Sequence, residues 1–423
     1  MSDKLGVGFV GAGFITNFHI RSWEGVREAD IVGIVSRTEA HAQAAADNCR
    51  KYRVGDPRVY KSISEMVADP AIDALWICAP NYLRIQMMEE IVETITSGRG
   101  KLVGVACEKP LGRNVAEAKK MLELADKVGI LHGYLENQVF APAITRGMEI
   151  LWRRGAALSG APYLARCAEE HSGPHEPWFW RGDQQGGGVL NDMMCHSIEV
   201  ARLMLSDPEE PKSSLTPKAV CAEIGCLKWS RSEYADRLKQ RSSGQVDYYN
   251  HPAEDYARAT VTFEDKRGRQ CVAEVTTSWS FVGAGLRLTY EVMGPEYSLQ
   301  NSSLNTETNV FLSRNVTGKE GEDLVEKQNA EQGLMPLVSN EEVVYGYTAQ
   351  NRYMANCFVD GRLPEENFED GILVMQMLMS AYMSAEQSRK LSFPPAGLDE
   401  FVPKVAKGTW KAIELTKGLP SEA

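Results

Sequence analysis

The stretch Val7-Gly8-Phe9-Val10-Gly11-Ala12-Gly13-Phe14-Ile15-Thr16 decides the fold of the first third of this 423-residue chain. A short apolar strand runs into a Gly-x-Gly turn, and a helical pattern follows. Glycine permits a tight bend and lets backbone amides approach a pyrophosphate, which the N-terminus of the next helix attracts. A Gly-x-Gly turn alone is a weak signal, but its place between a strand and a helix favours a dinucleotide-binding loop over a plain structural turn. Gly11, Gly13, Phe14 and Ile15 are therefore candidate dinucleotide contacts.

The same alternation continues downstream, where apolar runs are separated by stretches with apolar residues every three or four positions. We expect strands at residues 7–10, 31–35, 74–78 and 102–107. We expect helices at residues 40–52, 83–97 and 115–128. Continuous apolar strands alternating with helices predict a doubly wound parallel sheet of the Rossmann type, with its ligand crevice at the carboxyl ends of the strands.

After about Tyr134 the pattern changes to longer strands in which polar and apolar residues alternate. These are expected at residues 163–168, 219–227, 257–263, 270–279 and 286–293, with helices at 344–358, 369–388 and 400–415. Residues 230–255 are polar and predict an irregular insertion. Since a chain of 423 residues is too long to fold around one compact core, we expect two domains. We expect residues 1–134 to form an α/β Rossmann domain and residues 135–423 to form an α+β domain with an open, mainly antiparallel sheet.

Composition excludes several classes of protein. A net charge of -11 without a basic, aromatic-rich cluster argues against nucleic acid as a partner. No run approaches the ~18 apolar residues of a membrane helix, and the glycines near the N-terminus argue against a cleaved leader. Nine cysteines without a Cys-x-x-Cys pair predict reduced thiols and a cytoplasmic protein. Glycine and proline between His171 and His175 argue against a shared metal site, so no metal is expected.

The end of the second strand bears on the choice of dinucleotide. An acidic residue here usually binds the ribose 2'-hydroxyl of NAD, but the sequence reads Val35-Ser36-Arg37-Thr38. Ser36, Arg37 and Thr38, with His41 one helical turn later, suit a 2'-phosphate. This pattern favours NADP over NAD, with an exposed arginine at a helix start as the alternative.

Two motifs carry residues suited to proton transfer. Lys109 follows Glu108 at the end of the fourth strand, where a nicotinamide would lie. Asp192 and His196 follow a triple glycine and are four apart, so they share one helix face. Oxidation of a secondary alcohol needs a base with a pKa near the working pH, which histidine provides, and a lysine stabilises the developing alkoxide. Alternatively, Lys109 is a solvated strand end and His196 is a helix histidine bonded to Asp192.

Four motifs together resemble the Gfo/Idh/MocA family of sugar and cyclitol oxidoreductases. They are Gly11-Ala12-Gly13, Ala79-Pro80-Asn81, Glu108-Lys109-Pro110 and residues 186–196. The resemblance implies that Lys109 and His196 are the catalytic pair and that Asp192 supports them. It implies a homodimer or homotetramer through the C-terminal sheet, and further cofactor contacts at Ala79, Pro80, Asn81, Glu108, Lys109 and Asn137.

The chain departs from the family pattern in three places, and one stretch is distinctive. Thr16 stands where a small residue is usual, Arg84 stands where a histidine is common, and Glu136-Asn137-Gln138 replaces a more common Arg-Phe pattern, so an unusual substrate pocket is expected. In residues 169–181, aromatic and polar side chains alternate in a way that suits a sugar. His175, Trp180 and Arg181 are predicted, with Asp192 and His196, to contact the substrate, and the alternative is a lid packed for its own stability.

The leading hypothesis is therefore hydride transfer between NAD(P) and a secondary hydroxyl of a sugar, glycoside or cyclitol. One alternative is a glycosidase-like enzyme that keeps NAD(H) bound and acts by transient oxidation and elimination. Another is a non-enzymatic sensor of dinucleotide or sugar. A sensor needs no proton acceptor, so Lys109, Asp192 and His196 argue against it.

Overall fold

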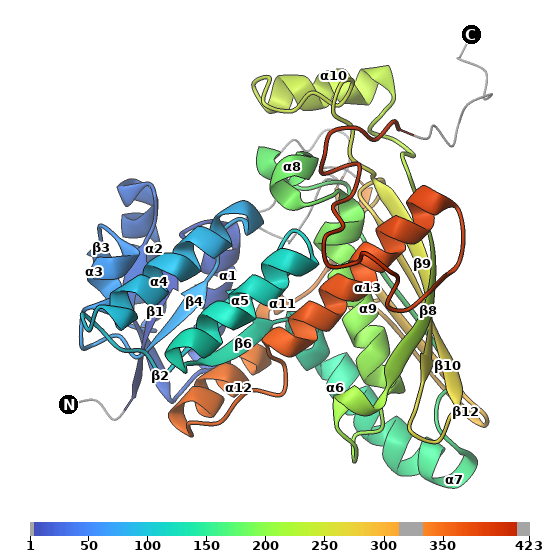
Figure 1. The fold of residues 1–423 in the computed structure, drawn as a ribbon, viewed down its shortest axis with the longest axis horizontal. Coiled ribbons are helices and arrows are strands. Elements are labelled where there is room, and N and C mark those ends of the chain that lie inside the picture. The colour runs from blue at the N-terminus through green and yellow to red at the C-terminus, as the bar shows by residue number, and fades with distance from the viewer. Residues whose placement is uncertain (1–3, 313–332, 413–423) are drawn as a thin grey trace. The chain divides into compact units, whose positions relative to one another are not determined.

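The computed structural model describes residues 4–312 and 333–412. The chain divides into two compact units. Figure 1 draws the chain as a ribbon coloured by residue number from the N-terminus to the C-terminus. Unit 1 consists of Met1–Pro142 and Glu342–Met375, and unit 2 consists of Ala143–Glu341 and Gln376–Ala423. The sequence-based boundary at residue 134 lies near the end of the first segment, whereas residues 342–375 return to unit 1.

Unit 1 contains a six-stranded, wholly parallel sheet in the order β3-β2-β1-β4-β5-β6. Its strands are β1 (Leu5–Val10), β2 (Ala29–Val35), β3 (Arg58–Tyr60), β4 (Ala74–Ile77), β5 (Gly104–Glu108) and β6 (Leu131–Leu135). Strand order runs outward from β1 in one direction and from β4 in the other, so right-handed crossovers place the connecting helices on opposite faces. The expected Rossmann sheet is confirmed, and β3 and β6 are additions to it.

Helices cover both faces of this sheet, with α4 beside α5 and α1 beside α2. The helices of unit 1 are α1 (Phe14–Ser22), α2 (Glu39–Tyr52), α3 (Ile63–Val67), α4 (Arg84–Thr96), α5 (Val115–Val128), α12 (Tyr347–Val359) and the first part of α13 (Phe368–Gln387), with short turns η1 (Trp23–Gly25), η2 (Asn81–Leu83) and η3 (Asn137–Phe140). Local signals define them: the Asn114 side chain caps α5, and Gly129 ends it in the left-handed region at φ 66°.

An aromatic cluster explains why residues from the end of the chain belong to unit 1. Trp76 of β4 packs edge-to-face against Trp23 and against Phe358 of α12, with ring centroids 5.2 and 5.6 Å apart. Phe9 of β1 packs against Trp23 at 5.5 Å. All four rings are buried, so α12 completes the hydrophobic core on this side of the parallel sheet.

Unit 2 contains a seven-stranded mixed sheet in the order β12-β11-β7-β10-β9-β8-β15, in which only the β10–β7 pair is parallel. Its strands are β7 (Leu164–Glu170), β8 (Thr216–Gly225), β9 (Tyr256–Glu264), β10 (Gln270–Ser278), β11 (Arg287–Gly294), β12 (Tyr297–Ser302) and β15 (Leu391–Ser392), with a separate pair β13 (Thr308–Leu312) and β14 (Gly333–Leu337). Burial alternates along β8 to β11, so one face is packed and the other is open. The mainly antiparallel C-terminal sheet is confirmed.

The buried helix α9 (Val189–Leu205) packs on β7, β9 and β10 (Figure 1). The other helical segments are α6 (Pro142–Ile150), the π-helical turn η4 (Leu151–Ala156), α7 (Ala157–Ser159), η5 (Pro177–Trp180), α8 (Gly182–Gln185), η6 (Lys212–Ser214), α10 (Ser232–Arg241) and α11 (Glu341–Val344), which ends in unit 1. No helix among the described residues is both long and apolar enough to cross a membrane.

Two sequence predictions for unit 2 are wrong. Residues 230–255 are not wholly irregular, because they include α10, which buries only Ala235 and Leu238. Residues 400–412 form turns instead of a helix, and residues 413–415 lie outside the described residues. Pro403 disfavours the helical conformation at Val402, and Gly408 adopts the left-handed region at φ 67°, so the expected helix is interrupted at both points. All nine cysteines are free thiols, and the cytoplasmic location stays a prediction.

Candidate functional site

The glycine loop after β1 is fixed from several directions. Gly11 has φ 110°, and a Cβ atom there would lie 2.6 Å from the carbonyl oxygen of Cys78, so only glycine fits. Its backbone amide donates to Val35 O at 2.8 Å. The hydroxyl of Thr16 donates to Gly11 O at 3.1 Å. Thr16, at the third position of the fingerprint, therefore stabilises the glycine turn through this side-chain hydrogen bond.

The loop leaves the start of α1 accessible. Gly13 caps α1 without a side chain, and a Cβ atom there would meet nothing within 4 Å. The first turn carries no acidic residue. Phe14 is exposed and Ile15 is partly buried. This arrangement suits a pyrophosphate, because the free amides and the dipole of a helix N-terminus both attract anions.

The residues after β2 are open to solvent. Arg37, Thr38 and His41 are exposed, and Ser36 is partly buried. The carbonyl of Thr38 accepts the amide of His41 at 3.1 Å, which starts α2. Among residues 4–312 and 333–412, no hydrogen bond or ion pair fixes the guanidinium of Arg37, so it is available to a ligand.

Arg84, the first residue of α4, joins the ends of β4 and β5. Its Nε donates to Ala79 O at 2.9 Å, and its Nη2 donates to Lys109 O at 3.2 Å. Its Nη1 donates to the carbonyl oxygens of Glu108 and Pro110. A buried guanidinium needs acceptors for its five N–H groups, and here the backbone supplies four. The main chain on both sides of Lys109 is therefore held in place.

Glu108 is buried at the end of β5. Its Oε1 lies 2.7 Å from Nε2 of His19, and its Oε2 accepts the amide of Lys109 at 3.1 Å. Burial alone would raise the pKa of Glu108. The hydrogen bond and charge of His19, with the charges of Lys109 and Arg84, outweigh burial and lower the pKa. Glu108 is therefore a carboxylate at neutral pH.

A buried network extends from His19 to α12. Nδ1 of His19 lies 2.9 Å from Nδ2 of Asn351, and that amide also donates to Ser22 Oγ at 2.8 Å. Oδ1 of Asn351 accepts the indole N–H of Trp76 at 3.0 Å. Nδ1 of His19 also lies 3.1 Å from Oδ1 of Asn351, so the Asn351 amide faces one ring nitrogen while the Glu108 carboxylate faces the other. Sequence reasoning missed this network because His19 and Asn351 are 332 positions apart.

The other predicted cofactor residues of unit 1 are buried, except Pro80, which is partly exposed. Ala79 and Pro80 lie between β4 and η2, and Asn81 is the first residue of η2. Asn137 lies in η3, and its Nδ2 donates to Tyr345 O at 2.7 Å. Strands β1, β4 and β5 are neighbours in the parallel sheet. Gly11, Ala79 and Lys109 therefore follow the carboxyl ends of three adjacent strands, which is where a doubly wound sheet binds its ligand.

In unit 2, α9 brings Asp192 and His196 onto one face, one turn apart. Both side chains are buried. Oδ2 of Asp192 accepts the indole N–H of Trp279 at 3.3 Å. Trp279 follows β10 and was not recognised from the sequence, since a tryptophan at the end of a strand has no distinctive pattern. Lys109 belongs to unit 1, and its convergence with His196 on one substrate is a proposal.

The triple glycine before α9 packs against protein side chains. A Cβ atom at Gly187 would lie 2.0 Å from the hydroxyl oxygen of Tyr382, and one at Gly188 would lie 2.4 Å from Glu254 O. Gly186 has φ 92°, in the left-handed region. These positions require glycine because a tyrosine and a glutamate occupy the space where side chains would point.

The predicted substrate residues differ in their accessibility. His175 and Arg181 are exposed, and Arg181 pairs with Asp183 at 3.0 Å. Trp180 is buried, and its indole N–H donates to Pro174 O at 3.0 Å. Its ring packs against the rings of Trp229, Tyr248 and Trp279. The indole N–H of Trp180 is therefore already used, and only the aromatic ring remains for contact with a substrate.

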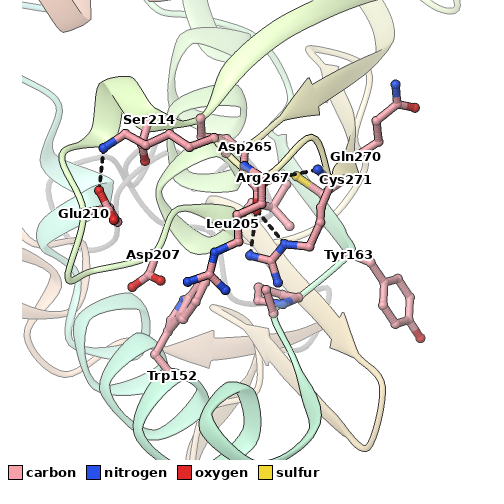
Figure 2. A pocket seen from close by; sticks show the side chains of 15 residues that line it. Trp152, Tyr163, Leu205, Asp207, Glu210, Ser214, Asp265, Arg267, Gln270 and Cys271 are labelled. Carbon is pink, nitrogen blue, oxygen red and sulfur yellow. Dashed lines mark hydrogen bonds and ion pairs between the residues drawn. The ribbon is translucent and has the colours of Figure 1, made fainter.

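Figure 2 shows a pocket of unit 2 that none of the predicted site residues lines. Its volume is about 160 Å³. Ion pairs of 2.6 Å, Lys266 with Glu210 and Arg269 with Asp265, engage four of its lining residues. This volume is below the roughly 300–1,000 Å³ of pockets that hold small ligands. The motifs, and not this pocket, define the candidate site.

Two family models match the chain. The one described as "Oxidoreductase family, NAD-binding Rossmann fold" matches residues 5–134, and the one described as "GFO/IDH/MocA C-terminal domain" matches residues 157–300. The chain belongs to the Gfo/Idh/MocA oxidoreductase family. The family resemblance drawn from the sequence motifs is confirmed.

Two curated relatives are named as a reductase and a dehydrogenase. A 1,5-anhydro-D-fructose reductase of Ensifer adhaerens is 28% identical over 203 residues, which are 47% of this chain and 56% of the relative. A myo-inositol 2-dehydrogenase of Thermotoga maritima is 24% identical over 219 residues, 52% of this chain and 60% of the relative. The chain spans about half the length of the curated relatives it matches.

Solved structures share the fold over nearly the whole chain. GenD2 from gentamicin A biosynthesis, in complex with NAD, has a TM-score of 0.72 at 23% identity and covers 93% of this chain and 97% of its own. A levoglucosan dehydrogenase in complex with NADH has a TM-score of 0.66 at 19% identity and covers 93% and 100%. At these identities the likeness establishes the Gfo/Idh/MocA fold alone.

Proposed function

We propose that this protein transfers a hydride between a nicotinamide dinucleotide and a secondary hydroxyl of a sugar, glycoside or cyclitol. The observation that carries the proposal is the placement of Lys109. It follows the carboxyl end of β5. The glycine loop follows the carboxyl end of β1, and the Ala79 segment follows that of β4, so all three lie at the same end of the parallel sheet. Lysine at this end lies where a nicotinamide would be held in a doubly wound sheet.

The residues of unit 1 fit a dinucleotide. Gly11 admits no side chain, Gly13 has open space beside it, and α1 begins without an acidic residue. These features let backbone amides meet a pyrophosphate. When bound, the nicotinamide supplies the hydride acceptor or donor. Ala79, Pro80, Asn81, Glu108 and Asn137 are proposed to contact the rest of the dinucleotide.

Lys109, His196 and Asp192 are proposed to handle the proton. In the oxidation direction, His196 accepts the proton of the substrate hydroxyl as that carbon becomes a ketone. The ammonium group of Lys109 hydrogen-bonds the same oxygen and stabilises the developing alkoxide. The carboxylate of Asp192, fixed by Trp279, orients the substrate hydroxyl.

The second unit is proposed to bind the sugar. His175 and Arg181 are exposed and supply polar contacts, while the ring of Trp180 is held rigid by three other aromatic rings. Aromatic rings suit the C–H faces of a sugar, and polar groups suit its hydroxyls. We also propose that the open face of the unit 2 sheet forms a homodimer or homotetramer, which light scattering of the purified chain tests.

A cofactor-reduction screen tests the proposed reaction. The purified protein is incubated with NAD⁺ or NADP⁺ and a panel of hexoses, pyranosides and inositols, and absorbance of the reduced nicotinamide is followed. Steady accumulation of reduced dinucleotide with at least one substrate is expected. Glycoside cleavage without net reduction would favour the transient-oxidation alternative, and silence with every substrate and both dinucleotides would remove the proposal.

A further inference from the structure

The first turn of α9 is capped by a residue far away in the sequence. A helix leaves its first backbone amides without partners, and the preceding glycines have no side chains to accept them. The amides of Gly188 and Leu190 donate to Oε1 of Glu254 at 2.9 and 3.1 Å. The amide of Val189 donates to the main-chain oxygen of Glu254 at 3.0 Å. Glu254 therefore satisfies three successive amides at the start of α9.

Tyr382 of α13 holds the carboxylate of Glu254 in this position. Its hydroxyl donates to Oε1 of Glu254 at 2.5 Å, and the hydroxyl oxygen of Tyr382 itself accepts the amide of Gly188 at 3.1 Å. Glu254 and Tyr382 are both fully buried. Oε2 of Glu254 has no hydrogen-bond partner among the described residues. Glu254, Tyr382 and the glycine turn are thus joined to one another by hydrogen bonds.

The charge of Glu254 is weakly compensated. Burial raises its pKa to about 7, against the hydrogen bonds of Tyr382 and the backbone amides. The titratable groups around it are Cys226, Tyr248, Asp255 and Tyr382. Asp255, the next residue, instead accepts the amides of residues 227–229. The hydroxyl of Tyr382 and the amides at the start of α9 are therefore the groups that stabilise the Glu254 carboxylate.

The residue after Glu254 fixes the partner of Asp192. The main-chain oxygen of Asp255 accepts the amide of Trp279 at 2.8 Å. The indole of Trp279 donates to Asp192 at 3.3 Å. Glu254 thus holds the start of α9, and the next residue, Asp255, holds Trp279, which donates to Asp192.

We propose that Glu254 is a positioning residue: by capping α9 it fixes the orientation of Asp192 and, one turn further, of His196. This inference rests on the proposed function, which places both residues at the substrate hydroxyl. Asp192 lies only two residues after the capped amide of Leu190, so fraying of the first turn displaces it directly. His196 follows through the helix at about 1.5 Å of rise per residue.

The variants Glu254→Ala, Glu254→Gln and Glu254→Asp of the full chain separate positioning from simple packing. Gln keeps an oxygen at the Oε1 position, and Ala removes it. Asp retains the carboxylate but withdraws it by one methylene, and this variant replaces Glu254→Ala if the Ala variant does not fold. Glu223→Gln is the control, because Glu223 is an exposed β8 residue paired with Arg258. Exposed pairs contribute little to stability.

Three measurements are made on each variant. Hydrogen exchange of the amides of residues 188–190 reports the cap, and ¹³C-histidine NMR, assigned with His196→Gln, reports the surroundings of His196. Turnover is measured with the best substrate of the screen. For Glu254→Ala we expect about 10-fold faster exchange, the scale of a lost helix cap. We also expect a shifted His196 resonance and a kcat lowered about 10-fold or more with KM for the dinucleotide unchanged. Glu254→Gln and Glu223→Gln are expected to match the wild type within a few-fold.

Two results would overturn the inference. Unchanged exchange at residues 188–190 in both Glu254→Ala and Glu254→Asp would show that Glu254 does not cap α9. Faster exchange with an unchanged His196 resonance and unchanged kcat would show that the cap does not position the site. If the wild type turns over no substrate, the proposed function fails, and the exchange and NMR results still decide whether Glu254 positions His196.

Discussion

The Nε2 atom of His19 lies 2.7 Å from Oε1 of Glu108, and both side chains are buried. His19 lies on α1, the helix that follows the glycine loop, and Glu108 precedes Lys109 at the end of β5. One contact therefore joins the loop proposed to hold the pyrophosphate to the strand end proposed to hold the catalytic lysine. The lowered pKa of Glu108 shows that this contact favours the carboxylate.

Replacing His19 with Phe should destabilise unit 1 more at neutral than at acidic pH. The substitution leaves the Glu108 carboxylate buried without its partner, which typically costs about 3 kcal/mol or more. Because the pKa of Glu108 is lowered in the folded protein, its contribution is present above its unfolded pKa and lost as pH falls through the folded value. Urea midpoints of the variant and wild type should differ at pH 7 and converge only as pH falls below the ordinary glutamate pKa of 4.5. Equal midpoints at pH 7 would refute the pairing, and Glu108→Gln added to His19→Phe should restore part of the loss.

Replacing Arg84 with Met should lower both stability and turnover. Four main-chain oxygens around β4 and β5 lose their donor, so we expect the midpoint of thermal unfolding to fall by roughly 5–10 °C. Displacement of Lys109 should reduce kcat about 10- to 100-fold. Arg84→Lys should recover little, because an ammonium lacks the planar fork of a guanidinium. The exposed Arg99, replaced with Met, is the control; similar losses in Arg99→Met would leave the clamp without support.

The fold was predictable where the sequence pattern is strong. Strand β1 is a continuous apolar run because both its faces are buried. Strand β3 was missed because it has three residues, one of them an exposed arginine, and β6 was missed because its apolar run is broken by His132 and Gly133. Helix α10 was missed because it is mostly exposed and its sequence is mostly polar. Short or solvent-facing elements carry too little hydrophobic pattern to be read locally.

The candidate site residues were named from sequence motifs and their roles stay predictions, whereas the contacts that surround them could not be predicted from the sequence. Motif spacing identified Lys109 and His196 as candidates. It did not reveal that Arg84 clamps the backbone of Lys109, or that Asn351 completes the network of His19. These contacts join segments that are distant in the sequence, and no local periodicity marks them. They depend on tertiary packing, which the sequence alone does not display.

Lys109→Ala and His196→Ala are each expected to lower kcat by a factor of about 10² to 10⁴, the usual contribution of a positioned acid or base. Neither change removes a proposed contact with the pyrophosphate, so the Kd for the dinucleotide, measured by fluorescence titration, should stay within about three-fold. Lys101→Ala, at an exposed position of unit 1, is the control. Normal turnover in both variants would show that the proposed acid/base roles are wrong.

Arg37→Asp should weaken the binding of NADP relative to that of NAD. The exposed guanidinium after β2 is proposed to pair with the 2'-phosphate, whereas a carboxylate accepts the ribose 2'-hydroxyl and repels a phosphate. We expect the Kd for NADP to rise about ten-fold or more, a loss of roughly 1.4 kcal/mol. Arg27→Asp changes the same charge at another exposed position of unit 1. Unchanged affinities for both dinucleotides would remove the 2'-phosphate argument.

Glu254→Gln should change how the stability of unit 2 depends on pH. Burial raises the pKa of Glu254 from 4.5 to about 7, so the folded protein favours the neutral acid. Stability linked to this group is therefore fully present below the unfolded pKa and is lost as pH rises through about 7. Glutamine does not ionise, so the variant should escape this loss, which amounts to about 3 kcal/mol at most between pH 5 and 8. Urea midpoints across that range should diverge, with the wild type falling relative to Glu254→Gln while Glu223→Gln follows the wild type. Parallel curves for the wild type and Glu254→Gln would mean that Glu254 does not titrate in the buried cap of α9.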